Sequence, residues 1–196
     1  KMEVDSIYAD AAERALYNGF LSALSLDGTS FFYENPLELD PKLLHRETFA
    51  RESTRMPLTQ RVHVFSCSCC PPNITRFVAS LGDHLYTVGG DTLYVHHYAE
   101  SAAQLEQGGK RMVIRQKTAY PNDGTIEIRV ENRTVEKISV RIPGWCGKWS
   151  VEIGGRELYR RAEKGYVTFA CPGDSETVTV RLDMTPFFVE AHPSVQ

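Results

Sequence analysis

The sequence predicts an α+β chain in which helices come first and an antiparallel β-sandwich follows. In the first part, apolar residues recur at the spacing of a helix, whereas in the second part they alternate with polar residues. The change falls near Gly89-Gly90. The length of 196 residues suits one large or two small domains. We therefore expect an incomplete helical domain at 1–88 and a sandwich domain at 89–196.

Two amphipathic helices are predicted in the first domain. One runs from about Val4 to Leu24 and is ended by Asp27-Gly28. The other begins after Asn73, which is a plausible N-cap. Its apolar residues lie at i, i+3, i+4 and i+7: Ile74, Phe77, Val78 and Leu81. Two helices alone would each leave an apolar stripe unburied, so we expect the chain to be a piece of a longer protein.

From residue 92 onward, short strands are predicted by alternation with period two. Asn122-Asp123-Gly124 and Gly154-Gly155 supply turns between them. Three segments show the alternation: 126–130, 138–142 and 178–182. Because no helical pattern separates these strands, an antiparallel sandwich is favoured over an α/β fold.

Composition excludes several classes of protein. Charged residues make up 24% and hydrophobic residues 42%, as in soluble globular proteins. The net charge of −3 offers no basic field, so we expect no nucleic-acid partner. No apolar run approaches the roughly 18–20 residues of a membrane span, so we expect no membrane partner. The first residues show no signal peptide and the cysteines are bunched, so we expect a reducing, cytoplasmic setting; export stays open because the parent's N-terminus is not seen.

Three of the five cysteines, Cys67, Cys69 and Cys70, lie within four positions, just before the second predicted helix. Such bunching favours metal or catalytic chemistry, since thiolates bind zinc and a helix start stabilises a thiolate. Three sulfurs cannot complete a four-ligand zinc site, so a residue elsewhere would have to complete it. Two other interpretations stay open: a disulfide between adjacent cysteines, or three small buried side chains.

Glu13 lies on the edge of the apolar face of the first predicted helix. A carboxylate in this position is either a solvated edge residue or a residue of a functional site, because glutamate is rarely buried without a partner.

The run Cys67-Ser68-Cys69-Cys70-Pro71-Pro72-Asn73, followed by Arg76 and Ser80-Leu81-Gly82, closely resembles the β-L-arabinofuranosidase family, glycoside hydrolase family 127. Further segments resemble the family in the same order along the chain. These segments are Glu13-Arg14-Ala15-Leu16-Tyr17-Asn18-Gly19, residues 31–38, Leu93-Tyr94-Val95 and Arg141-Ile142-Pro143-Gly144-Trp145.

This resemblance implies the C-terminal part of an (α/α)6 barrel, which carries the active site, followed by a β-sandwich. It implies a retaining glycosidase with a zinc-bound cysteine nucleophile. Cys69 would be that nucleophile, Cys69 and Cys70 would bind zinc, and Cys67 would lie beside the substrate. Glu13 and Tyr33 would line the sugar pocket, although Tyr33 could instead be an aromatic residue packed under a loop.

The chain departs from the family in one respect. The remaining zinc ligands belong to a Glu-Thr-Cys motif that this sequence lacks. We expect that motif and the acid/base glutamate upstream of Lys1, so the chain alone should be inactive. The implied partners are an arabinofuranoside-containing oligosaccharide or glycoconjugate and the remainder of the parent chain. Two alternatives remain: a non-catalytic carbohydrate-binding or structural sandwich module, and a related glycosidase with another sugar specificity.

Overall fold

The computed structural model describes residues 3–33, 47–51, 54–57, 60–63, 69–190 and 192–194. By its internal contacts the chain forms two compact units. One comprises Asp10–Asp83, and the other comprises Lys1–Ala9 with His84–Gln196. Within the described ranges, no helix is long and apolar enough to cross a membrane.

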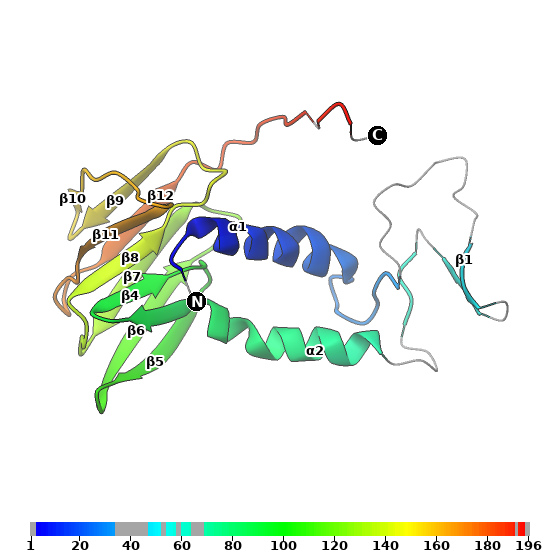
Figure 1. The fold of residues 1–196 in the computed structure, drawn as a ribbon, viewed down its shortest axis with the longest axis horizontal. Coiled ribbons are helices and arrows are strands. Elements are labelled where there is room, and N and C mark those ends of the chain that lie inside the picture. The colour runs from blue at the N-terminus through cyan, green and yellow to red at the C-terminus, as the bar shows by residue number, and fades with distance from the viewer. Residues whose placement is uncertain are drawn as a thin grey trace. The chain divides into compact units, whose positions relative to one another are not determined.

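The predicted first helix is confirmed, with a change of pitch inside it. Helix α1 (Ser6–Arg14) continues directly into η1 (Ala15–Leu21), which is a π-helix. Figure 1 shows this helix in blue. Short π-helical segments often lie at functional positions. The spacing of apolar residues does not reveal them, because it is nearly the same in an α-helix and in a π-helical segment of this length.

The second helix, α2 (Cys70–Ser80), begins earlier than predicted and continues into the 3₁₀ turn η3 (Leu81–His84). The prediction of Asn73 as N-cap is wrong, because Cys69 occupies that position and makes no side-chain capping hydrogen bond. Pro71 and Pro72 explain the early start. Proline is favoured in the first turn, where its fixed φ suits the helix and its missing N–H would have no partner.

The segment between the helices contains a two-stranded antiparallel ribbon. Its strands are β1 (Glu47–Arg51) and β2 (Thr54–Pro57). The sequence predicts no regular structure there, because the segment is charged and only weakly periodic.

The sandwich unit contains two sheets, drawn in green to orange in Figure 1. The four-stranded sheet has the order β11-β8-β4-β3, and the six-stranded sheet has the order β10-β9-β12-β7-β6-β5. The strands are β3 (Tyr86–Gly89), β4 (Thr92–Val95), β5 (Ser101–Gln107), β6 (Lys110–Thr118), β7 (Thr125–Glu131), β8 (Lys137–Arg141), β9 (Trp149–Ile153), β10 (Arg156–Glu157), β11 (Tyr166–Ala170) and β12 (Val178–Leu182).

The predicted antiparallel arrangement holds for every neighbouring pair of these strands except one. Strand β4 pairs with β8 in parallel, with Leu93 opposite Ile138. Parallel neighbours need a crossover connection, and here the chain makes β5, β6 and β7 of the other sheet before it returns. Local alternation of residues carries no information about such a crossover.

The alternating residues form one core between the sheets. In β7, Ile126, Ile128 and Val130 are each at most 1% exposed, while Glu127 and Arg129 face outward. Burial of each such aliphatic side chain contributes about 1.5–3 kcal/mol before the entropic cost of folding. The confirmed alternation is therefore also the main source of stability of this unit.

The segment before α1 is held against the start of β11. The backbone N–H of Ser6 donates to the carbonyl of Lys164 at 2.9 Å, and Lys164 forms an ion pair with Glu3. Gly165 has φ +73°, and a Cβ built on it would lie 1.9 Å from Ser6 Oγ. Only glycine permits both this left-handed backbone and this close approach.

Candidate active site

The sulfurs of Cys69 and Cys70 lie together at the start of α2. Their Sγ atoms are 3.7 Å apart, and neither cysteine is in a disulfide. Cys69 is exposed and Cys70 is half-buried. The backbone of Cys69 is already helical, with φ −75° and ψ −34°. Neither the disulfide nor the fully buried interpretation describes these two cysteines.

The first turn of α2 offers unusually few amide donors to an anion. Pro71 and Pro72 follow the cysteines directly and have no N–H group. The hydroxyl of Thr75 lies 3.1 Å from the carbonyl oxygen of Pro71 and 3.0 Å from that of Pro72, so it donates within the turn. A thiolate at Cys69 therefore receives less stabilisation from the helix start than an ordinary first turn would provide.

The chain before the cysteine run is attached to the end of the first helix. Arg61 donates from Nη2 to the carbonyl of Ser22 at 2.8 Å, and its guanidinium lies 4.4 Å from the ring centre of Phe32. Val62 exchanges backbone hydrogen bonds of 2.8 and 3.0 Å with Phe31. A cation at helix-terminal carbonyls is stabilised by the helix dipole.

The chain after the cysteine run is attached to the same helix. Phe77 of α2 packs edge-on against Phe20 of η1, with ring centroids 4.7 Å apart and an interplanar angle of 63°. Such aromatic contacts contribute about 0.5–1.5 kcal/mol beyond burial. Arg61 before the cysteine pair and Phe77 after it thus both contact the end of the first helix, at Ser22 and at Phe20.

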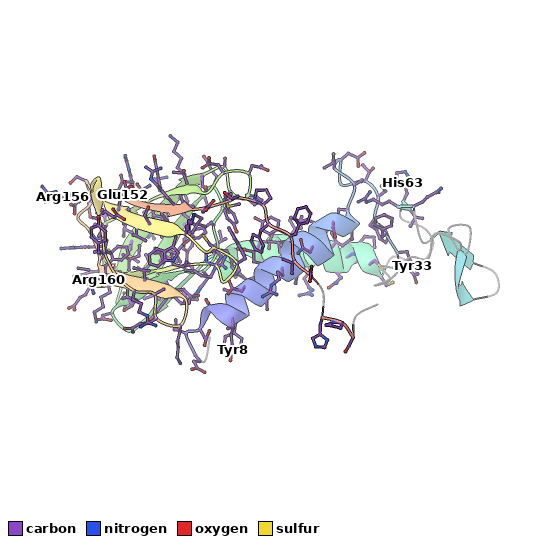
Figure 2. The ribbon with its side chains drawn as sticks, turned by 90° about the horizontal axis from the view of Figure 1, so that it is seen from above. Tyr8, Tyr33, His63, Glu152, Arg156 and Arg160 are labelled. Atoms are coloured by element: carbon purple, nitrogen blue, oxygen red, sulfur yellow. The ribbon has the colours of Figure 1, made fainter. Side chains whose placement is uncertain are left out.

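The other predicted site residues have different surroundings. Glu13 is only 6% exposed, so the interpretation as a solvated edge residue is wrong. Burial of a carboxylate is costly unless it is paired, which favours a functional or structural role. Tyr33, which is labelled in Figure 2, is half-buried and lies two residues after Phe31, the partner of Val62. Cys67 lies outside the described residues, and its predicted place beside the substrate stays a prediction.

The cysteine pair fits half of a zinc site. Two thiolates bound to one tetrahedral zinc at about 2.3 Å would stand about 3.8 Å apart, and the observed separation of the sulfurs is 3.7 Å. Among the described residues, no three His, Cys, Asp or Glu side chains gather as a metal-binding group. Zinc binding by this pair, with ligands from elsewhere in the parent, stays a prediction.

The contacts that attach the cysteine run to the helix were not predicted from sequence. Arg61 and Ser22 are separated by 39 positions. Phe77 belongs to the apolar stripe of the second predicted helix and Phe20 lies in the first predicted helix, but nothing local pairs them. The Arg61 side chain carries no motif, so only a structure or co-variation with residues 22–23 would identify it.

Aromatic residues of the sandwich serve mainly as core. Tyr98 is 2% exposed and Tyr166 is 4% exposed. His96 lies between two hydroxyls, 2.7 Å from Thr87 Oγ1 and 2.6 Å from the Tyr166 hydroxyl, and its ring stacks near Tyr94. Trp145 and Trp149 pack against the core. These rings do not form an exposed platform of the kind that stacks on sugars.

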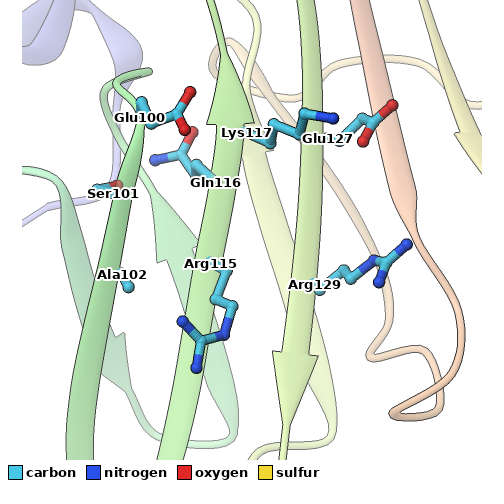
Figure 3. A pocket seen from close by; sticks show the side chains of 8 residues that line it. All are labelled: Glu100, Ser101, Ala102, Arg115, Gln116, Lys117, Glu127 and Arg129. Carbon is cyan, nitrogen blue, oxygen red and sulfur yellow. The ribbon is translucent and has the colours of Figure 1, made fainter.

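The sandwich has a hollow of about 570 Å³ on strands β5, β6 and β7 (Figure 3). Its lining is charged and non-aromatic, and Arg115 on its floor pairs with Glu131 at 3.1 Å. Lys117 and Glu127 stand opposite each other across the two strands. The lining residues are Glu100, Ser101, Ala102, Arg115, Gln116, Lys117, Glu127 and Arg129. Such alternating charges are typical of a solvated sheet face.

Comparison with known families identifies both parts of the chain. Residues 1–83 match the model described as the β-L-arabinofuranosidase GH127 catalytic domain. Residues 92–184 match the GH127 middle domain. The chain is thus built like a glycoside hydrolase that joins a helical catalytic domain to a sandwich. It belongs to glycoside hydrolase family 127.

Similar proteins agree with this assignment. A non-reducing end β-L-arabinofuranosidase of Bifidobacterium longum subsp. longum is 31% identical over all of this chain and 30% of its own length. A crystal structure of a family 127 β-L-arabinofuranosidase from Geobacillus stearothermophilus is 38% identical, with TM-score 0.83 over 98% of this chain and 30% of that one. A family 127 β-arabinofuranosidase matches with TM-score 0.72 at 31% identity, over 91% of this chain and 29% of its own. The chain therefore spans about a third of the length of these relatives.

Proposed function

We propose that this chain is part of a retaining glycoside hydrolase that releases L-arabinofuranose from β-L-arabinofuranosides, with Cys69 as nucleophile. The similar proteins with that activity support the reaction and the sugar. The observation that carries the assignment to Cys69 is the pair of sulfurs 3.7 Å apart at the start of a helix, neither of them in a disulfide. Residues 1–88 would be the end of an (α/α)6 barrel, completed by the rest of the parent chain.

Cys69 and Cys70 would hold a zinc ion with ligands from elsewhere in the parent. When bound, zinc would keep the sulfur ionised near neutral pH and lower its basicity, so that it could also leave. Stabilisation of the thiolate by zinc fits the first turn of α2. Pro71 and Pro72 lack the two amide N–H groups that could otherwise stabilise a thiolate there.

In the first step, the Cys69 sulfur would attack the anomeric carbon as the glycosidic C–O bond breaks. A glutamate of the parent would give its proton to the departing oxygen. In the second step, that glutamate would take a proton from water, the water oxygen would attack the anomeric carbon, and the sulfur would leave. Two displacements retain the anomeric configuration. Glu13 and Tyr33 would bind sugar hydroxyls.

The test uses the full-length parent and an aryl β-L-arabinofuranoside. Cys69→Ser should lower kcat/KM at least about a thousandfold, because a hydroxyl cannot replace an activated thiolate. Cys70→Ser should lower the bound zinc measured by elemental analysis, together with activity. Cys171→Ala is the matched control, because that buried cysteine lies in the sandwich and should leave both quantities unchanged.

Equal rates for the parent and Cys69→Ser would overturn the assignment. A parent without zinc, or with no hydrolysis of the arabinofuranoside, would instead favour the sandwich module or another sugar specificity. Robust turnover by residues 1–196 alone would contradict the expectation that the catalytic site is incomplete.

A further inference from the structure

The helix that follows the cysteine pair carries a second polar group on the face that bears Cys69. Residues i, i+4 and i+7 of a helix share one face. With Cys69 at i, these positions are held by Asn73 and Arg76. At 100° per residue the three fall within an arc of about 60°. On the same scale the apolar residues of α2 lie about 80–180° from Cys69, and Phe77, which meets Phe20, is at the near edge of that range.

Asn73 and Arg76 are hydrogen-bonded to each other. Arg76 donates from Nη2 to Asn73 Oδ1 at 2.8 Å, and both side chains are exposed. Because arginine can only donate, the amide oxygen must face Arg76 and the amide nitrogen must face away. In the described part of the chain, that nitrogen has no hydrogen-bond partner. Its two N–H donors are therefore available to a ligand.

Helix geometry predicts which turn the Asn73 side chain covers. Helical side chains lean toward the N-terminus, so a residue covers the turn that precedes it. From this rule we expect the Asn73 amide to lie over the turn that begins with Cys69. This is the turn in which Pro71 and Pro72 leave two backbone positions without an N–H.

We infer that Asn73 binds the substrate and that Arg76 positions it: the Asn73 amide donates to the 2-hydroxyl oxygen of the arabinofuranosyl residue that Cys69 attacks. This inference rests on the proposed function. The 2-hydroxyl is attached to the carbon next to the anomeric carbon, and hydrogen bonds to it strengthen at the transition state of glycosidases. An amide oriented by a guanidinium loses little freedom on binding.

The test pairs enzyme variants with a modified substrate, using the full-length parent and aryl β-L-arabinofuranosides with and without the 2-hydroxyl. The enzyme without substitutions should have a kcat/KM about tenfold lower on the 2-deoxy substrate than on the ordinary one, because the hydrogen bond from Asn73 cannot form. Asn73→Ala should lower kcat/KM on the ordinary substrate by about the same factor. Removal of the 2-hydroxyl should then lower the kcat/KM of this variant no further, because the hydrogen bond is already absent. Asn73→Leu keeps a similar side-chain volume but can neither donate nor accept a hydrogen bond, so its 2-deoxy penalty should vanish as well.

Thr75→Ala is the matched control on another side of the same turn, and it should keep the full 2-deoxy penalty. Arg76→Lys should retain more of the penalty than Arg76→Ala, because lysine can still donate to the Asn73 oxygen. An unchanged penalty in Asn73→Ala, with Cys69→Ser inactive, would overturn this inference and leave the proposed function standing. Full activity of Cys69→Ser would overturn the proposed function itself.

Discussion

At the scale of single residues, the four cysteines that the structure describes divide into two environments. Cys69 and Cys70 lie at a helix start, with the first of them exposed. Cys146 and Cys171 are at most 9% exposed and pack in the sandwich core. Burial raises the pKa of both core thiols above the ordinary value, because a thiolate is poorly solvated there.

We predict that alkylation of residues 1–196 at pH 8 modifies Cys69 and Cys70 well before Cys146 and Cys171. Only thiolate reacts, and burial limits both its amount and its access. Peptide mapping by mass spectrometry after timed quenching measures the order. Denaturant should abolish the difference, and early labelling of Cys171 in the folded chain would contradict the assigned burial.

The same two core thiols predict that the folded chain becomes less stable at high pH. Their folded pKa lies above the unfolded value, so their neutral form stabilises the fold fully below about pH 9. That contribution should be lost as the pH rises from there through the folded pKa. The experiment on alkylation can be repeated across this range, since core labelling should increase with pH.

The sequence singled out residues for a candidate site but did not predict their surroundings. The cysteine run was found because its chemistry and spacing are local. Burial of Glu13 was left open, because one helical position on the edge of a stripe fits solvent and interior equally well. The attachment of Arg61 to Ser22 depends on chain segments 39 positions apart, and no periodicity encodes such a pairing.

At the scale of elements, the contact between β11 and the segment before α1 rests on one glycine. Gly165 combines φ +73° with the approach of Ser6. Strand periodicity correctly predicted β7, β8 and β12, but it could not predict this contact, the parallel pairing of β4 or the π-helical pitch of η1. Each of these depends on partners outside the local window of residues.

We predict that Gly165→Ala lowers the free energy of unfolding by about 2–3 kcal/mol, because the left-handed backbone and the Ser6 contact both become unfavourable. Gly155→Ala is the matched control: its φ is +78° but nothing lies within 4 Å of its would-be Cβ. It should cost only about 1 kcal/mol. Urea denaturation of residues 1–196 measures both, and equal losses would show that Ser6 does not approach Gly165.

At the scale of the whole molecule, burial is divided unequally between the two units. The hydrophobic core comprises residues of the sandwich, whereas α2 contains no fully buried residue. Burial of apolar side chains therefore stabilises the sandwich unit much more than it stabilises α2 within this chain. Opening free energies of backbone amides follow local burial and contact density.

We predict that amides of β7 and β12 exchange with deuterium at least about a hundredfold more slowly than amides in the middle of α2, in residues 1–196. The same α2 amides should become protected in the full-length parent. Hydrogen exchange read by mass spectrometry tests both statements. Comparable protection of α2 and β7 in the short chain would show that the helical unit is stable without the rest of the parent.

The attachment of Ser6 to Lys164 has a consequence for how the protein is made and divided. The ion pair of Glu3 with Lys164 joins positions 161 apart, so a ribosome must synthesise both helices and most of the sandwich before this junction can close. A sandwich expressed from residue 84 onward would lack Glu3 and Ser6. It would therefore lose their contacts with Lys164 and leave Gly165 without its neighbour Ser6. In the sequence, the unit that contains the sandwich begins before the helical unit and ends after it. Cutting the chain at one position therefore cannot separate the two units.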